Sequence, residues 1–302
     1  MKFTWHYQGT TPRKLRSVLK SCGVTSSLIK VAIFHGGALL IGDHPAWAVE
    51  KVQPGQTVGI VLPDELANPK VVACDKQFMI AYEDDDFLII NKAAGVATVP
   101  AHNVPVQDSL VNRVKYYYVA NHYPNQVTHV ATRLDKDTSG LVIFPKHRFA
   151  HAVLDSQLKR HEVKKDYLAV VGGHLAIEHG YIYAPIERDP ASFVKRRVSP
   201  SGKPSVTEFW TKQAGKCATI VQVRLHTGRT HQIRVHFSFL GHPLEGDEMY
   251  GGDCELVQRQ ALHCERVSFF SPFKQRQITC QAPLPNDLQQ LIHQLQITKE
   301  CG

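Results

Sequence analysis

The sequence predicts an α+β protein with more than one domain. Short runs rich in β-branched and apolar residues have the length of strands, and longer segments place apolar residues at helical spacing. The chain of 302 residues is long enough for a sizeable core and favours two domains over one. We therefore expect a strand-rich unit with flanking helices, preceded by a smaller N-terminal unit.

Residues 1–66 are predicted to form this smaller unit, with two short helices and a few short strands. At 100° per residue, a first helix at Arg13–Cys22 has a basic and an apolar side. The basic side consists of Arg13, Arg16 and Lys20, and the apolar side of Leu15, Val18, Leu19 and Cys22. A second helix, Ser26–Phe34, follows a Thr25 N-cap. Its buried positions would be Leu28, Ile29, Ala32 and Ile33.

Residues 67–77 are predicted as a linker, because Asn68 and Pro69 interrupt any regular pattern. The second unit would cover residues 78–302. It contains two amphipathic helical segments, Ser109–Ala120 with Asp108 as its N-cap and Arg148–Arg160. Its strand-like runs are Met79–Glu83, Phe87–Asn91, Val127–Val130, Leu141–Phe144, Lys165–Val171, Ser205–Thr211 and Ala218–Leu225.

Composition and charge narrow the class of protein. The formal net charge is +8, with positive charge denser in residues 1–70, which favours a polyanionic partner such as a nucleic acid. Seven scattered cysteines without a Cys-x-x-Cys pair indicate reduced thiols in a cytosol. No apolar run approaches the roughly 20 residues that span a bilayer, and the N-terminus lacks an apolar signal core, so we expect a cytoplasmic protein.

The stretch Thr128–Lys146 holds a polar centre, Arg133–Gly140, between two apolar runs. Asp, Thr, Ser and Gly together favour a turn that hydrogen-bonds its own backbone. The turn places the carboxylate Asp135 beside a strand, with Arg133 two residues earlier. By spacing alone, a hairpin corner with a surface ion pair is the more frequent explanation.

Other site patterns are absent from the sequence or weak. It contains no Gly-x-Ser-x-Gly, no glycine-rich phosphate loop and no His-Glu-x-x-His. His226, His231 and His236 recur every five residues, a spacing that fits neither a helix face nor a strand face, so we expect no metal cluster there. What remains is a carboxylate that could attack carbon or take a proton from it.

Several segments in order resemble the RluA-type pseudouridine synthases, which isomerise uridine within RNA. The segments are FMIAYEDDDFLIINKAAG (78–95), RLDKDTSGL (133–141), KKDYLAVV (164–171), GRTHQIR (228–234) and RQALHCERVSF (259–269). The resemblance implies a mixed, mainly antiparallel sheet with flanking helices and an active site in a cleft across it. The first 66 residues loosely resemble the alpha-L RNA-binding module of ribosomal proteins.

The resemblance also implies residue roles. Asp135 falls on the catalytic Asp, which starts cleavage of the bond between uracil N1 and ribose C1′ before the base is rejoined through C5. Whether it adds to C1′ or removes a sugar proton stays open. Arg234 would pair with Asp135 and favour its ionised form. Arg229 is the alternative partner and could instead bind phosphate. Tyr167 matches the family's active-site Tyr, which stacks on the base and moves a proton from C5.

The substrate-binding residues implied are Leu262 and Thr138 beside the uracil pocket, and Arg133, which would enter the RNA as the uridine flips out. Two positions depart from the family pattern: Thr132 stands where His is usual, and Ala93 where Pro is usual. The family requires no cofactor or metal.

The expected partner is RNA. Basic groups would hold its phosphates: Arg13, Arg16, Lys20 and an exposed basic loop at Lys195, Arg196 and Arg197. Ribosomal RNA is the first choice and tRNA the alternative, and we expect a monomer. Two rivals are a non-catalytic RNA-binding or chaperone protein, which would not need Asp135, Arg234 and Tyr167 together, and a base-removing glycosylase, which would release free uracil.

Overall fold

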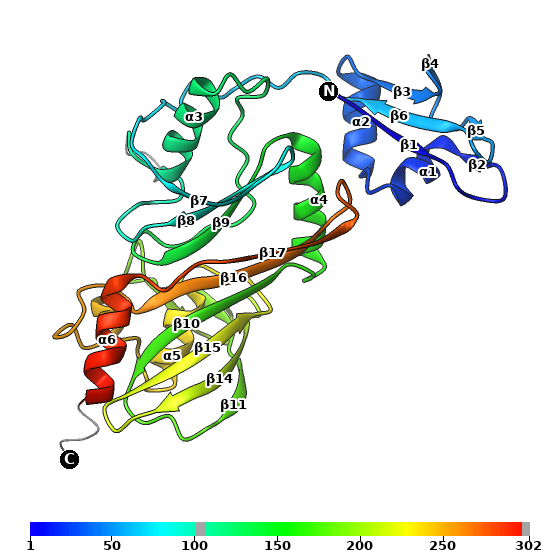
Figure 1. The fold of residues 1–302 in the computed structure, drawn as a ribbon. Helices are drawn as coiled ribbons and strands as arrows, with labels where there is room; N and C mark the ends of the chain where they lie inside the picture. The colour runs from blue at the N-terminus through cyan, green and yellow to red at the C-terminus, as the bar shows by residue number, and fades with distance from the viewer. Residues whose placement is uncertain (101–106, 298–302) are drawn as a thin grey trace.

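The computed structural model describes residues 1–100 and 107–297, and shows a small N-terminal unit beside a larger one (Figure 1). The elements of the N-terminal unit are β1 (Lys2–His6), β2 (Arg13–Lys14), α1 (Leu15–Ser21), α2 (Ser26–Phe34), β3 (Ala38–Ile41), β4 (His44–Pro45), β5 (Lys51–Val52) and β6 (Thr57–Val61). Its four-stranded sheet has the order β1-β6-β3-β4, and α1 and α2 pack against β6.

Capping residues and apolar spacing in the sequence predicted both helices of this unit to within two residues. The hydroxyl of Thr25 accepts a hydrogen bond from the Leu28 N–H at 3.3 Å, as expected for the N-cap of α2. Helix α1 begins two residues later than predicted, because Arg13 and Lys14 pair with Val52 and Lys51 as β2. Ile33 is 40% exposed rather than buried, since the sheet covers a stripe of α2 too narrow to include it.

The larger unit is built on a nine-stranded sheet. Its first elements are β7 (Met79–Glu83), β8 (Phe87–Lys92), α3 (Leu110–Ala120), β9 (Ser139–Pro145), α4 (Arg148–Lys159), β10 (Lys164–Gly172), β11 (His179–Tyr183), β12 (Ile186–Arg188) and β13 (Arg196–Val198). The chain continues with β14 (Val206–Ala214), β15 (Ala218–Leu225), α5 (Gln232–Phe239), the 3-10 helix η1 (Glu248–Tyr250), β16 (Leu262–Ser271), β17 (Arg276–Gln281) and α6 (Asn286–Ile297).

The strand order is β11-β14-β15-β10-β16-β9-β8-β7, with β17 paired to β16. Among the described residues, every pairing within this sheet is antiparallel except that of β9 with β16, so the predicted mixed, mainly antiparallel sheet is confirmed. Successive residues of a strand face opposite sides. Along β8 and β9 the odd-numbered apolar residues contact α4 and the even-numbered ones contact α3. Helix α5 shares the apolar cluster of α4, and α6 packs on the opposite side of β10.

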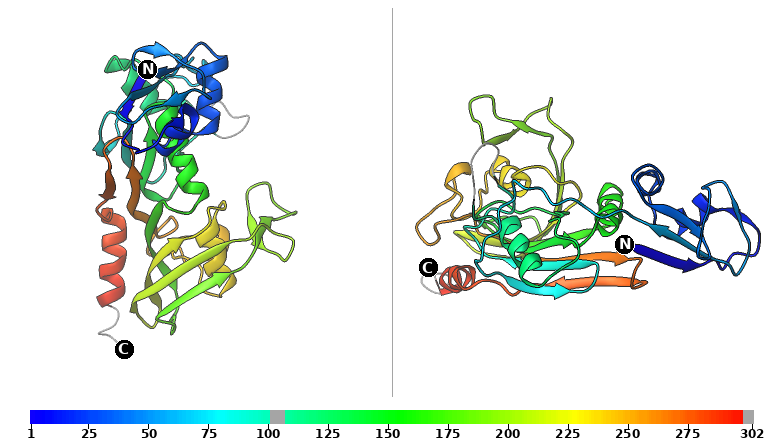
Figure 2. Two further views of the ribbon diagram at one scale, coloured as in Figure 1. Left: turned by 90° about the vertical axis from the view of Figure 1, so that its right-hand side faces the viewer. Right: turned by 90° about the horizontal axis from the view of Figure 1, so that it is seen from above.

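Three predicted local features differ in the structure. Val127–Val130 is not a strand: the Val127 N–H bonds the Asn125 side chain rather than a neighbouring strand. Ser109, not Asp108, is the N-cap of α3, and Asp108 instead pairs with Arg113 at 2.7 Å and Lys76 at 2.7 Å. The predicted basic loop at 195–197 is largely strand β13, which pairs with β12 to form a ribbon that projects from the body of the molecule (Figure 2).

Candidate active site

The turn that carries Asp135 leads directly into β9. At the start of β9, Ser139 and Gly140 pair in parallel with His263 and Cys264 of β16. Gly140 has φ +113°, and a Cβ at this position would lie 2.3 Å from the Cys264 carbonyl oxygen. Because a side chain fits neither the backbone angle nor the space, glycine is required where the turn joins the sheet.

Two buried polar side chains donate hydrogen bonds to the backbone carbonyls of this turn. Lys92, which is 1% exposed, donates through Nζ to the carbonyl oxygens of Ala93, Val96 and Lys136 at 2.8–2.9 Å. Thr98 Oγ1 donates to the Leu134 carbonyl at 2.8 Å. Burial lowers the pKa of Lys92 to about 7, against the opposing charges of Asp137 and Asp135. The residues around Asp135 are therefore fixed by side chains from the end of β8 and from the segment that follows it.

Thr132 also anchors this segment. Its Oγ1 accepts a hydrogen bond from the Ile143 N–H of β9 at 3.0 Å, and the Ala131 N–H bonds the Ile143 carbonyl at 3.1 Å. The side chain is 7% exposed. Thr132, which stands where His is usual in the resembling family, thus ties the strand to the segment that presents Asp135.

The guanidinium of Arg234 lies between two carboxylates. Its Nη1 is 3.3 Å from Asp135 Oδ2, while Nε and Nη2 bond the two carboxylate oxygens of Asp247 at 2.6 and 2.8 Å. Burial opposes the charge of Arg234, but the hydrogen bonds and charge of Asp247, joined by Asp135, raise its pKa overall. Asp247 is 1% exposed, so it fixes the guanidinium from inside, whereas the side chain of Asp135 is 27% exposed and reaches the cavity.

An aromatic and an imidazole ring surround this ion pair. Tyr250 has its ring 5.0 Å from the Arg234 guanidinium carbon, and its hydroxyl lies 2.9 Å from His231 Nδ1. His231 is the N-cap residue of α5, with φ 58°, and its Nε2 lies 3.9 Å from Asp135 Oδ2. Burial lowers the pKa of His231 despite the nearby Asp135 carboxylate, which favours the neutral ring beside the carboxylate.

Tyr167 lies in the cavity wall on β10 and is 4% exposed. Burial, the neighbouring Cys264 thiol and the negative charge of Asp135 raise the pKa of Tyr167 well above its usual range. The phenol therefore stays protonated at neutral pH. A neutral phenol ring of this kind can stack on a base ring but does not act as a phenolate.

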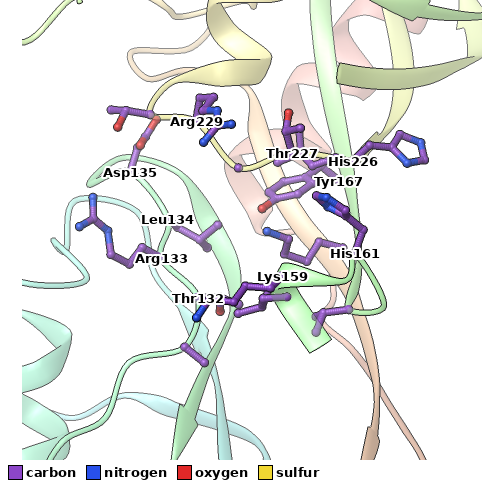
Figure 3. A pocket seen from close by; sticks show the side chains of 17 residues that line it. Thr132, Arg133, Leu134, Asp135, Lys159, His161, Tyr167, His226, Thr227 and Arg229 are labelled. Atoms are coloured by element: carbon purple, nitrogen blue, oxygen red, sulfur yellow. The ribbon is translucent and has the colours of Figure 1, made fainter. Parts of the chain in front are cut away.

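Thr132, Asp135 and Tyr167 line a cavity of about 450 Å³ between the Asp135 segment, the end of α4, β10 and the loop that follows β15. Figure 3 shows Arg133 and Asp135 on one wall, and Tyr167, His161 and His226 on the facing wall. A smaller adjoining cavity, of about 60 Å³, is lined by Asp135, Tyr167 and Arg234 together with Thr138 and Leu262. The structure thus brings together residues from five segments of the sequence.

The predicted substrate-binding residues occupy different positions around these cavities. Arg133 is exposed at the rim, and Leu262 is 4% exposed at the start of β16. Thr138 is 2% exposed and accepts a hydrogen bond from Gln260 Nε2 at 3.2 Å. Arg229 donates to the Pro204 carbonyl at 3.2–3.3 Å and has no ion pair with Asp135, so Arg234 is the guanidinium that contacts the carboxylate.

The basic groups fall into two sets. Arg13, Arg16 and Lys20 are all exposed on the N-terminal unit. In the ribbon, Arg197 pairs with Glu187 at 2.8 Å, Lys195 Nζ lies 5.6 Å from the centre of the Tyr250 ring, and the Arg196 N–H donates to the Tyr250 hydroxyl at 2.9 Å. The ribbon is therefore attached to the aromatic ring beside Arg234 rather than being a free basic loop.

Four contributors to the site were not predicted: Lys92, His231, Asp247 and Tyr250. His231 lies within the GRTHQIR segment (228–234), where only Arg229 and Arg234 were given roles, and Tyr250 lies in a segment whose local pattern carries no catalytic signal. Asp247 lies 13 residues from Arg234, a separation that matches no helical or strand period. A buried lysine within an apolar strand was the one available signal, since lysine is seldom fully buried without partners.

No cluster of three or more His, Cys, Asp or Glu side chains that could hold a metal ion occurs in the described residues. The cysteines of residues 1–100 and 107–297 are all free thiols. No helix in the described part of the chain combines the length and apolar character that crossing a membrane requires.

In comparisons with known proteins, the family model and two relatives that match this chain are described as pseudouridylate or pseudouridine synthases. Residues 86–239 match the family model described as RNA pseudouridylate synthase. The chain is 40% identical over 270 residues to the uncharacterised RNA pseudouridine synthase YjbO of Bacillus subtilis (strain 168), covering 89% of this chain and 95% of that protein. It is 34% identical over 284 residues to ribosomal large subunit pseudouridine synthase D of Salmonella typhimurium (strain LT2), covering 88% and 85% respectively.

Solved structures are similar in fold. Human RNA pseudouridylate synthase domain containing 1 has a TM-score of 0.57 and 25% identity, covering 74% of this chain and 96% of that one. Human RNA pseudouridylate synthase domain containing 4 has a TM-score of 0.59 at 20% identity, covering 72% and 93%, and supports the fold alone.

Proposed function

This chain belongs to the RNA pseudouridylate synthase family, and from that premise we propose that Asp135 starts its reaction and that ribosomal RNA is its substrate. As a member of this family it is an isomerase that converts uridine to pseudouridine within RNA. The observation that carries the proposal is a single carboxylate, Asp135, which reaches the cavity while Arg234 pairs with it and Asp247 holds Arg234.

The proposed first step is cleavage of the bond between uracil N1 and ribose C1′. Attack of Asp135 on C1′ and removal of a sugar proton both leave the electron pair of the broken bond on the uracil. The fixed guanidinium of Arg234, 3.3 Å away, orients the Asp135 carboxylate toward the cavity, which a carboxylate needs for either role. The base then turns within the cavity and is rejoined to C1′ through C5.

The other cavity residues receive supporting roles. Tyr167 stacks on the uracil ring, and Leu262 and Thr138 pack at the adjoining wall. Arg133, exposed at the rim, enters the space that the flipped uridine leaves in the RNA. Arg229 binds a phosphate, because its side chain lies at the mouth of the cavity and its charge has no carboxylate partner in the described residues.

Ribosomal RNA is the proposed substrate because relatives that this chain matches at 34–36% identity are named ribosomal large subunit pseudouridine synthase D. The N-terminal unit, residues 1–66, would act as an RNA-binding module joined by a linker at 67–77 to the catalytic domain, 78–302. Phosphate contacts would come from Arg13, Arg16, Lys20 and the ribbon residues Lys195, Arg196 and Arg197. We propose that the protein acts as a monomer in the cytosol.

The test uses ribosomal RNA and tRNA fractions from cells that lack the protein, labelled with tritium at uridine C5. Wild-type protein should release tritium to water, and Asp135→Asn should release none while binding the RNA within a few-fold of wild type. Asp137→Asn, which removes a carboxylate two residues away, is the matched control and should keep activity within a few-fold. Release by Asp135→Asn in a folded state would refute the assignment of Asp135.

The same assay separates the alternatives. Release from the tRNA fraction alone would move the substrate from ribosomal RNA to tRNA. Absence of release from every fraction, with folded and RNA-bound protein, would favour a non-catalytic RNA-binding role. Free uracil among the products would identify a base-removing glycosylase.

A further inference from the structure

One amine in the cavity has no role in the reaction as described so far. Lys165 is on β10, two residues before Tyr167, and alternation along a strand directs both side chains to the same face. The residues between and before them, Asp166 and Lys164, face the other side. Asp166 pairs there with Arg224 at 2.7 Å, and Lys164 is exposed.

The end of the Lys165 side chain lies inside the cavity. Lys165 is among the lining residues, and a Cβ built on Gly228 of the facing loop would lie 3.9 Å from its Nζ. In the part of the chain that the structure describes, no carboxylate or carbonyl forms a hydrogen bond or ion pair with this amine. The titratable and charged groups around the same cavity are Arg133, Asp135, Lys159, His161, Tyr167, His226 and Arg229, with Cys264 behind Tyr167.

The reaction requires a proton acceptor after the base has been rejoined to the sugar through C5. When the base is rejoined through C5, that carbon carries both the new bond to C1′ and its original hydrogen, which must leave as a proton. Asp135 is paired with Arg234 at the sugar end of the site. Tyr167 is a poor acceptor, because its raised pKa keeps the phenol protonated. Burial lowers the pKa of Lys165, with a smaller opposing effect from Cys264, and so increases the fraction of neutral amine.

We propose that Lys165 Nζ is the general base that takes the proton from C5, an inference that rests on the proposed function. The C5–H bond breaks, its electron pair forms the C5=C6 double bond, and the pair of the N1=C6 double bond moves onto N1. The proton from C5 forms a new N–H bond on Lys165. N1 gains a proton from water, and the ammonium returns its proton to water in the cavity. The proton count is balanced, and no oxidant or additional reactant is required.

The experiment compares Lys165→Met, Lys165→Arg and Lys164→Met in single-turnover reactions on RNA carrying hydrogen or deuterium at uridine C5. Loss of a general base predicts a rate about 10²-fold lower or more for Lys165→Met, with a C5 isotope effect larger than that of wild type. Lys165→Arg should be equally slow, because a guanidinium keeps its proton. Lys164→Met removes the neighbouring charge on the opposite face and should stay within a few-fold of wild type.

Two further readouts distinguish proton transfer from a structural role. The wild-type rate should rise with pH as the amine loses its proton, and this limb should be missing in Lys165→Met. Lys165→Ala leaves space for a small amine, so added methylamine should restore part of its rate. This second variant keeps the test decisive if circular dichroism shows that Lys165→Met is misfolded.

The proposal is overturned if Lys165→Met keeps the wild-type rate, or if Lys165→Arg restores it, since the site would then need a cation rather than a base. These outcomes are distinct from failure of the proposed function. If Asp135→Asn releases as much tritium as wild type, or wild type releases none, the assignment of the reaction itself fails, whatever the Lys165 variants do.

Discussion

At the scale of single residues, the site depends on one guanidinium shared by two carboxylates of different exposure. Asp247 is buried and bonds two nitrogens of Arg234, whereas Asp135 meets the third at the cavity. A buried ion pair contributes little net stability, but removal of one partner is costly because it leaves the other charge uncompensated. Asp247 therefore orients Arg234 toward Asp135, and we expect its loss to disturb the site.

Asp247→Asn is expected to destabilise the protein by about 3–5 kcal/mol, the usual cost of removing one member of a buried pair. Turnover should also fall, since Arg234 loses the partner that directs it. Urea unfolding and the tritium-release assay measure the two effects. Glu248→Gln, an exposed neighbour, should change stability by less than about 0.5 kcal/mol. Equal effects of the two substitutions would contradict the proposed role of Asp247.

Thr132→Val should cost about 1–3 kcal/mol, because the buried Ile143 N–H loses the hydroxyl oxygen that it bonds at 3.0 Å. Activity should fall as well, since Asp135 follows three residues later in the same segment. Thr132→Ser keeps the oxygen and should retain both properties. The idea is wrong if Ser and Val behave alike in urea unfolding and turnover.

At the scale of elements, Glu65 anchors the stretch just before the predicted linker to the larger unit. Glu65 accepts hydrogen bonds from the Arg148 N–H at the start of α4 at 2.8 Å and from Asn125 Nδ2 at 3.1 Å, and lies 2.8 Å from His129 Nε2. Burial alone would raise the pKa of Glu65, but His129 and the Arg148 N–H outweigh it and hold the pKa at about 2. The stretch that leads into the predicted linker is therefore attached to the start of α4 and to the segment between α3 and β9.

Glu65→Gln should destabilise the protein by about 3 kcal/mol at pH 7, from a carboxyl pKa lowered from 4.5 to about 2. Because the pKa is lower in the folded state, this stability is fully present above pH 4.5 and is lost as the pH falls toward 2. Urea unfolding at pH 7 and at pH 3 measures the difference, which should shrink at the lower pH. The exposed neighbour Asp64→Asn is the control, and a difference independent of pH would disprove the electrostatic explanation.

At the scale of the whole molecule, the N-terminal unit is packed against the larger unit. Its apolar cluster includes Phe149 and Val153 of α4, and the Phe3 and Phe149 rings meet edge to face with centroids 5.0 Å apart. Phe273, in the β16–β17 turn, has its ring centroid 4.9 Å from that of Phe149 and 6.0 Å from that of Phe3. A shared apolar contact of this kind favours a fixed orientation of the two units, which would present one continuous surface to RNA.

The combined substitution Arg13→Gln, Arg16→Gln and Lys20→Gln should weaken RNA binding, because fewer phosphates are neutralised. The slope of the logarithm of affinity against that of salt concentration should become shallower by about 0.7–0.9 for each phosphate that the variant no longer neutralises. The rate at saturating RNA should stay near that of wild type, since these residues lie outside the cavity. Filter binding over a range of salt concentrations measures the slope.

The control for this triple substitution is a second triple of equal charge. Lys70, Lys212 and Lys216 are all exposed, and their replacement by Gln removes the same three positive charges from elsewhere on the surface. Equal slopes for the two triples would contradict a specific role of Arg13, Arg16 and Lys20 in binding.

Much of this protein follows from local sequence. The helices at Ser26–Phe34 and near Arg148–Lys159 and the turn at Asp135 were predicted because capping residues, side-chain period and turn chemistry act within a few residues. The mainly antiparallel sheet and the membership in a family of RNA isomerases came from motifs in order along the chain. Signals of these kinds can be interpreted without knowing which distant segments of the chain contact one another.

Tertiary structure decided the rest. Arg234 and Asp135 are 99 residues apart, and Lys92 bonds a carbonyl 44 residues away. Three features depend on which strands pair and which face each side chain occupies: the buried carboxylate behind Arg234, the hydrogen bond from β9 to Thr132, and the entry of Lys165 into the cavity. The sequence determined what each residue can do chemically. Long-range strand pairing determined which of them share a cavity, because burial and charge act over distances in space and not along the chain.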